Sequence, residues 1–315
     1  MTRGTLIYIG QRLLLITLTA LIVSSVVFIG VHQLPGNAFL SERRTNPAAQ
    51  AALLHHYGLD LPWPVQYLNW LTAVVFHGDL GESLVNRGVK ITPLVIREAG
   101  TSATLGFWAM VFTITLGMSL GILAAVKQNT ILDYVASFCA VIGYSMPSFV
   151  TATFLVLLTV TGFYAWSGGM IYENIGWGKP EQIPVPAISL GLLPSAIIFR
   201  LTRASMLEVI RQDYVRTAWA KGLRSRIVVI RHALRNALIP VITILGPITT
   251  SVITGSIVIE YIFGIPGLGK EFINSIANRD YNIVIGVFTF YAILVGVANL
   301  LVDLVYPILD PRIRY

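Results

Sequence analysis

Charged residues and cysteine are both scarce in this chain of 315 residues. Only 12% of the residues are Asp, Glu, Lys or Arg, whereas 55% are hydrophobic. This balance excludes an ordinary soluble domain and is typical of a polytopic membrane protein. The single cysteine, Cys139, lies inside an apolar run, which excludes an internal disulfide framework and a cysteine-based metal site.

Residues that could hold a metal or perform catalysis are equally sparse. None of the five histidines has a cysteine or carboxylate at zinc-like spacing. The Ser, His and Asp residues form no set that suggests nucleophilic catalysis. We therefore expect no metal site, no cofactor and no catalytic residue in this chain, and a membrane-bound enzyme is a weak alternative. The histidines are His32, His55, His56, His77 and His232.

Positive charge is concentrated in one segment, Arg200–Arg235. It holds nine basic and two acidic residues, which leaves +7, the net charge of the whole chain. Apolar runs flank it on both sides, so the positive-inside rule predicts that it is cytoplasmic. Because the excess is confined to one loop between helices, we expect membrane lipids rather than nucleic acid as its non-protein partner.

Six apolar runs are long enough to cross the roughly 30 Å hydrocarbon layer. They predict an all-α integral membrane protein with six transmembrane helices and both termini cytoplasmic. Residues 1–31 form the N-terminus and first helix, 32–100 an external loop, and 101–315 a core with helices two to six and the cytoplasmic loop 200–236. The runs cover about residues 13–31, 101–126, 134–164, 183–199, 237–259 and 282–306.

The external loop contains an aromatic segment, Trp63–Phe76. Its aromatic spacing suits a helix that lies at the membrane interface, where Trp and Tyr rings are favoured. Packing of the same helix against the first transmembrane helix explains the pattern equally well.

Prolines interrupt three of the apolar runs, and the fourth run is the weakest of the six because Pro184, Pro186 and Pro194 crowd its outer half. Met146-Pro147 lies within the third, and Pro240 and Pro247 share one face of the fifth. Proline removes a backbone donor and clashes with the preceding turn, so we expect kinks at these sites. Such breaks either face a transport pathway or are purely structural. Our candidates for the translocation path are Met146, Pro147, Pro240 and Pro247.

Two other features have structural interpretations. Gly264–Glu271 has the spacing of a phosphate-binding loop, but Glu271 replaces the Ser or Thr that should reach magnesium, and no strand precedes it. We interpret it as a Gly/Pro turn that closes the fifth helix. Asp303 is ionisable and lies in an apolar run, but near its cytoplasmic end, where Arg312, Arg314 or water can meet it.

The basic loop itself predicts two helical stretches. Asp213–Leu223 contains helix formers and ends at Gly222, which suits the left-handed position that closes a helix. A second stretch runs from Arg224 towards Arg235. In the first, Val215, Ala218, Trp219 and Gly222 share a narrow face, whose small residues permit the close approach of another protein surface. A helix that lies flat on acidic lipid is the alternative.

At Tyr214–Leu223 and Arg231–Pro240 the sequence resembles the permease subunits of ATP-binding-cassette importers. It is most similar to the first permease of the dipeptide, oligopeptide and nickel branch, and the resemblance covers nearly the whole chain. It extends to Arg12, Gly78–Ser83, Lys127–Asn129, Met146–Phe149, Glu260, Phe263–Gly269, Arg279–Tyr281 and Asp310–Tyr315.

The loop departs from the general superfamily pattern of Glu-Ala-Ala, three residues, Gly, nine residues and Ile-x-Leu-Pro. Aligned on Gly222, only Ala218, Gly222 and Leu234 match, and the initial Glu and final Pro are missing. These departures are similar to those of the peptide branch.

The resemblance implies that the loop helix docks on a cytoplasmic ATPase, and that ATP-driven closure of two ATPases moves the permease between inward-facing and outward-facing states. It also implies a second permease and an extracytoplasmic binding protein, in the inner membrane of a prokaryote, with ATP and Mg²⁺ held by the ATPases. The cargo would be peptides or similar small solutes. The docking candidates are Asp213, Tyr214, Arg216, Thr217, Ala218, Lys221, Gly222 and Leu223.

The rival class is a secondary transporter or channel that acts without ATPases. It predicts buried carboxylates near the middle of the bilayer and commonly an internal repeat. Neither is visible in the sequence. The identity of the substrate does not follow from these spans.

Overall fold

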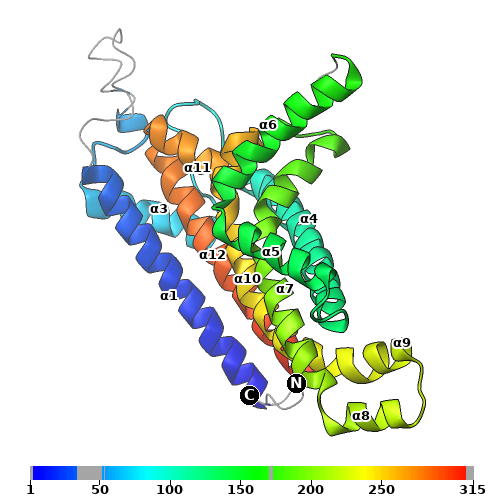
Figure 1. The fold of residues 1–315 in the computed structure, drawn as a ribbon. Helices are drawn as coiled ribbons and strands as arrows, with labels where there is room; N and C mark the ends of the chain where they lie inside the picture. The colour runs from blue at the N-terminus through cyan, green and yellow to red at the C-terminus, as the bar shows by residue number, and fades with distance from the viewer. Residues whose placement is uncertain (1–2, 34–51, 53, 170–172, 310–315) are drawn as a thin grey trace. The chain divides into compact units, whose positions relative to one another are not determined.

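The computed structural model describes residues 3–33, 52, 54–169 and 173–309, and these are almost entirely helical (Figure 1). Within these ranges the extended structure is limited to one isolated bridge between Glu82 and Lys90. The elements are α1 (Arg3–Gln33), α3 (Trp63–His77), α4 (Ile91–Val126), α5 (Ile131–Ser145), α6 (Ser148–Ser167), η1 (Pro180–Gln182), α7 (Pro184–Ile210), α8 (Asp213–Ala220), α9 (Ser225–Ile227), the π-helical turn η2 (Val228–Leu234), α10 (Arg235–Phe263), α11 (Leu268–Ala277) and α12 (Tyr281–Leu309).

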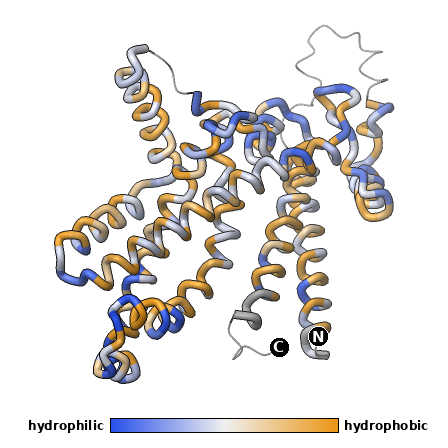
Figure 2. Tube along the Cα trace, turned by 90° about the vertical axis from the view of Figure 1, so that its right-hand side faces the viewer, coloured by the Kyte–Doolittle hydropathy of each residue, from blue (hydrophilic) through white to orange (hydrophobic). Residues whose placement is uncertain are grey.

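Six helical segments are long and apolar enough to cross a membrane, as the sequence predicts. Figure 2 shows hydrophobic residues along the long helices, with hydrophilic residues gathered in the connections. The all-α class with six spans is therefore confirmed, whereas the cytoplasmic placement of the termini stays a prediction. The segments are Leu6–Gln33, Ile91–Val126, Ser148–Ser167, Pro180–Ile210, Ser225–Ile253 and Tyr281–Leu304.

The chain divides into two compact units that are not continuous in sequence. Unit 1 comprises Met1–Ser102 and Pro266–Val297, and unit 2 comprises Ala103–Ile265 and Ala298–Tyr315. In unit 1, α3 packs against α1. The Tyr67 hydroxyl of α3 forms hydrogen bonds of 2.8 Å with Ser24 Oγ and 2.9 Å with Ser25 Oγ of α1. Packing of the aromatic segment on the first helix is thus confirmed; its position at a membrane interface stays a prediction.

Helix α7 is the centre of unit 2, where it contacts α5, α6 and α10. In the apolar part of the Pro180–Ile210 segment, 67% of the residues are buried by the rest of the protein. In the Ser148–Ser167 segment the share is 11%. Pro184 and Pro186 lie in the first turn of α7. Backbone N–H groups there have no acceptor within the helix, so proline, which lacks this group, costs no hydrogen bond. The hydrophobic signal of the fourth span is low in the sequence because this helix is surrounded by other helices. Its residues must pack closely against them, so hydrophobicity is not the only requirement on them.

Small residues set the distance between α4 and α7. A Cβ added to Gly117 would lie 2.7 Å from the carbonyl oxygen of Ser195, and one added to Gly121 would lie 2.7 Å from Cβ of Thr202. A Cβ on Gly191 would lie 2.7 Å from the carbonyl oxygen of Ala109. The backbones approach so closely that only glycine fits, as in membrane helix pairs with a Gly-x-x-x-Gly motif.

Several predicted boundaries were wrong, each for a physical reason. The helix that contains the second span begins at Ile91, ten residues before the predicted Thr101, and it includes the charged pair Arg97-Glu98, of which Glu98 is buried. The third run is two separate helices, since α5 ends at Ser145 and Pro147 caps α6. The two helices leave this break in different directions (Figure 1). Helix α11, within the predicted third external loop, was not anticipated.

Candidate functional site

Helix α8 occupies the predicted first stretch of the basic loop. It runs over Asp213–Ala220, and its C-terminal end is closed by Gly222, which has φ +75°. That left-handed conformation costs most residues with a side chain some backbone strain, so the turn favours glycine at this position. The prediction of a short helix closed at Gly222 is confirmed, as is a second helical stretch, which forms α9 and η2.

The apolar stripe of α8 faces the chain itself. Val215 and Ala218 are buried in a cluster with Val228 of η2, and Leu223 packs against it. The prediction that Ala218 lies on a face open to another protein was therefore wrong, because an eight-residue helix needs its apolar side covered to be stable and η2 covers it. Leu223 likewise supports the helix from within.

The rest of the α8 surface is open, including Trp219 and Gly222, which the sequence placed on one face with the buried Val215 and Ala218. The side chain of Asp213 is fully exposed, that of Arg216 is 71% exposed and lies 3.9 Å from the Asp213 carboxylate, and Tyr214 and Trp219 each keep 43% of their surface. Thr217, Lys221 and Gly222 are exposed as well. The structure thus gathers six of the eight predicted docking residues, together with Trp219, into one mixed aromatic and charged surface. We call Asp213, Tyr214, Arg216, Thr217, Trp219, Lys221 and Gly222 the α8 outer face.

This face is connected directly to a long helix. The side-chain amide of Asn236, in the first turn of α10, donates a hydrogen bond of 2.8 Å to the hydroxyl of Tyr214. Together with the Val215–Val228 contact, this bond fixes α8 to the segment that continues into α10. A force applied to α8 therefore reaches α10 through a hydrogen bond and an apolar contact.

An ion pair that sequence reasoning missed joins α7 to the start of α5. Arg203 donates to Asp133 through Nε at 2.7 Å and Nη2 at 2.8 Å. Asp133 is 2% exposed and also accepts the backbone N–H of Asn129 at 3.1 Å. Bidentate pairs of this kind are strong and geometrically specific. The pair, which we call the α5–α7 clamp, ties the α4–α5 turn to the helix that leads into α8.

The path candidates lie on two elements of unit 2. Met146 and Pro147 form the α5–α6 break, where Met146 is half-buried and Pro147 is exposed. Pro240 and Pro247 are both inside α10 and both exposed. Their position on one face of α10 agrees with the sequence, but their role in transport stays a prediction.

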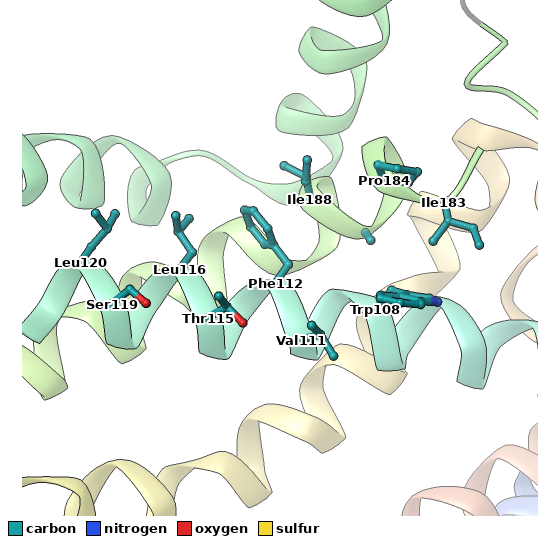
Figure 3. Close-up of a pocket in the computed structure, with 11 residues that line it drawn as sticks. Trp108, Val111, Phe112, Thr115, Leu116, Ser119, Leu120, Ile183, Pro184 and Ile188 are labelled. Carbon is teal, nitrogen blue, oxygen red and sulfur yellow. The ribbon is translucent and has the colours of Figure 1, made fainter. Parts of the chain in front are cut away.

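A groove of about 490 Å³ lies between α4 and the start of α7 (Figure 3). Trp108, Phe112 and Leu116 of α4 face Ile183 and Ile188, and the polar groups among the lining side chains are the hydroxyls of Thr115 and Ser119 and the indole N–H of Trp108. Peptide groups need hydrogen-bond partners at membrane depth. The groove is consequently unsuited to a peptide, and we do not assign it to the translocation path.

On the other unit, Asp280 brings together two motifs that are distant in sequence. Its carboxylate, 1% exposed, accepts hydrogen bonds from the Ser83 hydroxyl and from the N–H groups of Leu84 at 3.2 Å and Val85 at 3.3 Å. The Asn282 side chain donates to the carbonyl oxygen of Glu82 at 2.9 Å. The Gly78–Ser83 and Arg279–Tyr281 motifs therefore form one structure, which we call the Asp280 socket.

A second carboxylate lies near this socket. Burial raises the pKa of Glu271, and the negative charge of Asp280 raises it further, while Lys270 and Arg97 act in the opposite direction. An acid whose pKa is raised on folding binds more protons in the folded state, so stability falls as the pH rises from the ordinary pKa of the group through the folded value. Near neutral pH, Glu271 therefore reduces the stability of unit 1.

Replacing Asp280 by alanine should loosen the socket. It leaves two N–H groups and the Ser83 hydroxyl without their acceptor, at an expected cost of about 3 kcal/mol in the free energy of unfolding. Hydrogen exchange at the amides of Leu84 and Val85 should become faster, and the melting temperature should fall. The matched control is Asn278→Ala, at an exposed position two residues away, and equal exchange in both variants would contradict the socket.

The remaining sequence candidates have structural roles or stay untested. Gly264 has φ +68° and caps α10, so the prediction of a closing turn is confirmed. In the part of the chain that the structure describes, no three His, Cys, Asp or Glu side chains form a metal-binding group. Asp303 lies in α12, but Arg312 and Arg314, its predicted partners, are outside the described residues.

Comparison with known proteins decides the family. The family described as "Binding-protein-dependent transport system inner membrane component" matches residues 117–315, which include α5 to α12 and the whole basic loop. The chain belongs to this family. It is a multi-pass inner-membrane permease, which disfavours the secondary transporter or channel alternative.

Curated relatives resemble the permease over almost its whole length. The dipeptide transport system permease protein DppB of Bacillus subtilis (strain 168) is 40% identical over 307 residues, covering 98% of this chain and 97% of the relative. DppB of Escherichia coli (strain K12) is 37% identical over 336 residues, covering 98% of each. The oligopeptide transport system permease protein OppB of the same strain is 38% identical over 310 residues, covering 98% and 99%.

A solved structure shares the fold. A chain of the MetNI methionine ABC transporter, in an inward-facing conformation, superposes with a TM-score of 0.57 at 18% identity and covers 70% of this permease and 98% of that chain. The family and this fold together confirm the ATP-binding-cassette permease that the motifs predict.

Proposed function

We propose that this permease is one of two homologous membrane subunits of an ATP-driven importer for peptides or similar small solutes. The relatives named for dipeptide and oligopeptide transport support the class of cargo. The observation that carries the proposal is the α8 outer face, an exposed aromatic and charged surface held to α10 through Tyr214 and Asn236.

In this proposal the α8 outer face docks in a groove on a cytoplasmic ATPase. Two ATPase subunits bind ATP and Mg²⁺ and approach each other, and the motion passes through α8 to α10 and, through the α5–α7 clamp, to α5. The ATP cycle favours one arrangement of the helices because the ATPases bind the two arrangements with different affinities. This chain itself supplies no catalytic group.

Substrate would reach the permease from an extracytoplasmic binding protein. The Asp280 socket supports this because it holds the 83–85 loop firmly at the start of α12, which gives the binding protein a defined surface. The path would then run past the α5–α6 break and the proline face of α10.

The test is a mild-detergent purification of the chain from its native membrane, with partners identified by mass. We expect a second six-span permease and ATPases with intact phosphate-binding loops. Recovery of the chain alone or as a homo-oligomer, with transport after reconstitution in the absence of ATP, would contradict the proposal and favour a secondary transporter.

A further inference from the structure

Much of the positive charge in the basic loop lies away from α8. Arg224, Arg226, Arg231 and Arg235 belong to the segment that begins before α9, passes through η2 and enters α10, and all four are exposed. Within the described ranges none of them makes an ion pair, in contrast to Arg203 with Asp133 and Arg216 with Asp213. Four neighbouring arginines without a carboxylate indicate a partner with negative charge.

Two large apolar side chains lie among these arginines. Ile227 and Ile230 are 42% and 53% exposed, so both lie on the open surface of the segment. The other side is covered, since Val228 and Ala233 are almost completely buried. A helix with one buried side and one side of mixed arginine and isoleucine is typical of a segment that lies in a membrane interface.

The position of the segment agrees with that environment. The helical segment that contains the fifth apolar stretch begins at Ser225 and continues to Ile253, so the arginine-bearing residues lead directly into that stretch. In Figure 1, α9 lies between α8 and the long helices of unit 2, which leaves α8 on the far side. A segment in this position would reach the depth of the lipid headgroups if α8 faces the cytoplasm.

We propose that the exposed side of Arg224–Arg235 binds anionic phospholipids of the cytoplasmic leaflet. The guanidinium groups pair with headgroup phosphates, for which their planar donor geometry is well suited, and Ile227 and Ile230 insert at the upper end of the acyl chains. A protein groove would also neutralise the arginines. The membrane is favoured because the two isoleucines are adjacent to a spanning helix and α8 occupies the side away from it.

The lipid contact is distinct from ATPase docking and does not depend on it. It would hold the base of α10 at a fixed depth while α8 is free to follow its partner. The test is therefore made on this full-length chain without ATPases, so that loss of lipid contact and loss of ATPase docking give separate results.

The test measures the depth of single spin labels in lipid nanodiscs. A Cys139→Ala background carries Ile230→Cys or, as the matched control on the α8 outer face, Thr217→Cys. The discs contain phosphatidylcholine alone or a mixture with phosphatidylglycerol. With phosphatidylglycerol we expect the Ile230 label to be accessible to oxygen and protected from a water-soluble nickel chelate, and the Thr217 label to show the reverse.

Charge removal makes the test specific. Arg224→Gln combined with Arg226→Gln should abolish the extra protection that phosphatidylglycerol gives to the Ile230 label, whereas Arg216→Gln combined with Lys221→Gln should leave it unchanged. Three results would overturn the proposal. The Ile230 label could be exposed to water in both discs, it could be equally protected with and without phosphatidylglycerol, or its protection could appear only after ATPases are added.

Discussion

Gly117→Ala is expected to destabilise unit 2 by about 2 kcal/mol or more, although it adds a single methyl group. The new Cβ would lie 2.7 Å from the carbonyl oxygen of Ser195 and 2.8 Å from Cβ of Ile198. Backbone atoms cannot move aside cheaply, so α4 and α7 must separate and lose contact along their length. Thermal unfolding in mild detergent, followed by size-exclusion fluorescence, measures the loss.

The matched control is Gly162→Ala in α6, which has no atom within 4 Å of the added Cβ. Alanine has the higher helix propensity, so this variant should be as stable as the original or more stable. The two substitutions are chemically identical and should have opposite signs. Equal melting temperatures for both variants would contradict the close α4–α7 contact.

Arg203→Ala is expected to cost about 3 to 5 kcal/mol, because it leaves the buried Asp133 carboxylate without its cation. Asp133→Ala should cost less, since the Arg203 side chain is 30% exposed and can reach water. The double variant Asp133→Leu with Arg203→Leu should recover much of the loss, because an apolar pair replaces a charged one. Melting temperatures of the original protein, Asp133→Ala, Arg203→Ala and the variant that combines these two alanine substitutions complete a double-mutant cycle, and the leucine pair is measured beside them.

The cycle also tests whether the clamp is a single unit. Strong coupling between the two sites is expected for side chains that share two hydrogen bonds of 2.7 and 2.8 Å. Additive losses would show that the pair does not act together, and the clamp would then have no part in transmitting motion from α8 to α5.

The sequence predicts elements that depend on local chemistry. Apolar length identifies the six spans, Gly222 and Gly264 identify two helix ends, and Pro147 identifies a break. The Gly117-x-x-x-Gly121 motif was readable in the second apolar run and would have predicted a close helix pair, but not that its partner is α7. Such features are determined by residues within one or two turns of each other.

Pairings across long separations could not be predicted. Asp133 and Arg203 are 70 residues apart, and Asp280 is 196 residues from Leu84, so their contacts follow from the tertiary fold and from no local pattern. The same limit explains the error at Ala218. Its spacing predicts an apolar face correctly, but whether that face meets another protein or η2 is decided by how the chain returns after Gly222.

ATP-driven uptake by the reconstituted importer with Gly222→Arg tests the central claim most directly. Gly222 is exposed, has φ +75° and has no atom within 4 Å of an added Cβ, so an arginine strains the turn and projects from the α8 outer face rather than into the chain. Gly222→Ala carries the same strain without the bulk and serves as the control. We predict normal membrane insertion for both variants, with uptake abolished in Gly222→Arg and largely retained in Gly222→Ala. Normal uptake by Gly222→Arg would contradict the assignment of α8 as the surface that couples this permease to its ATPases.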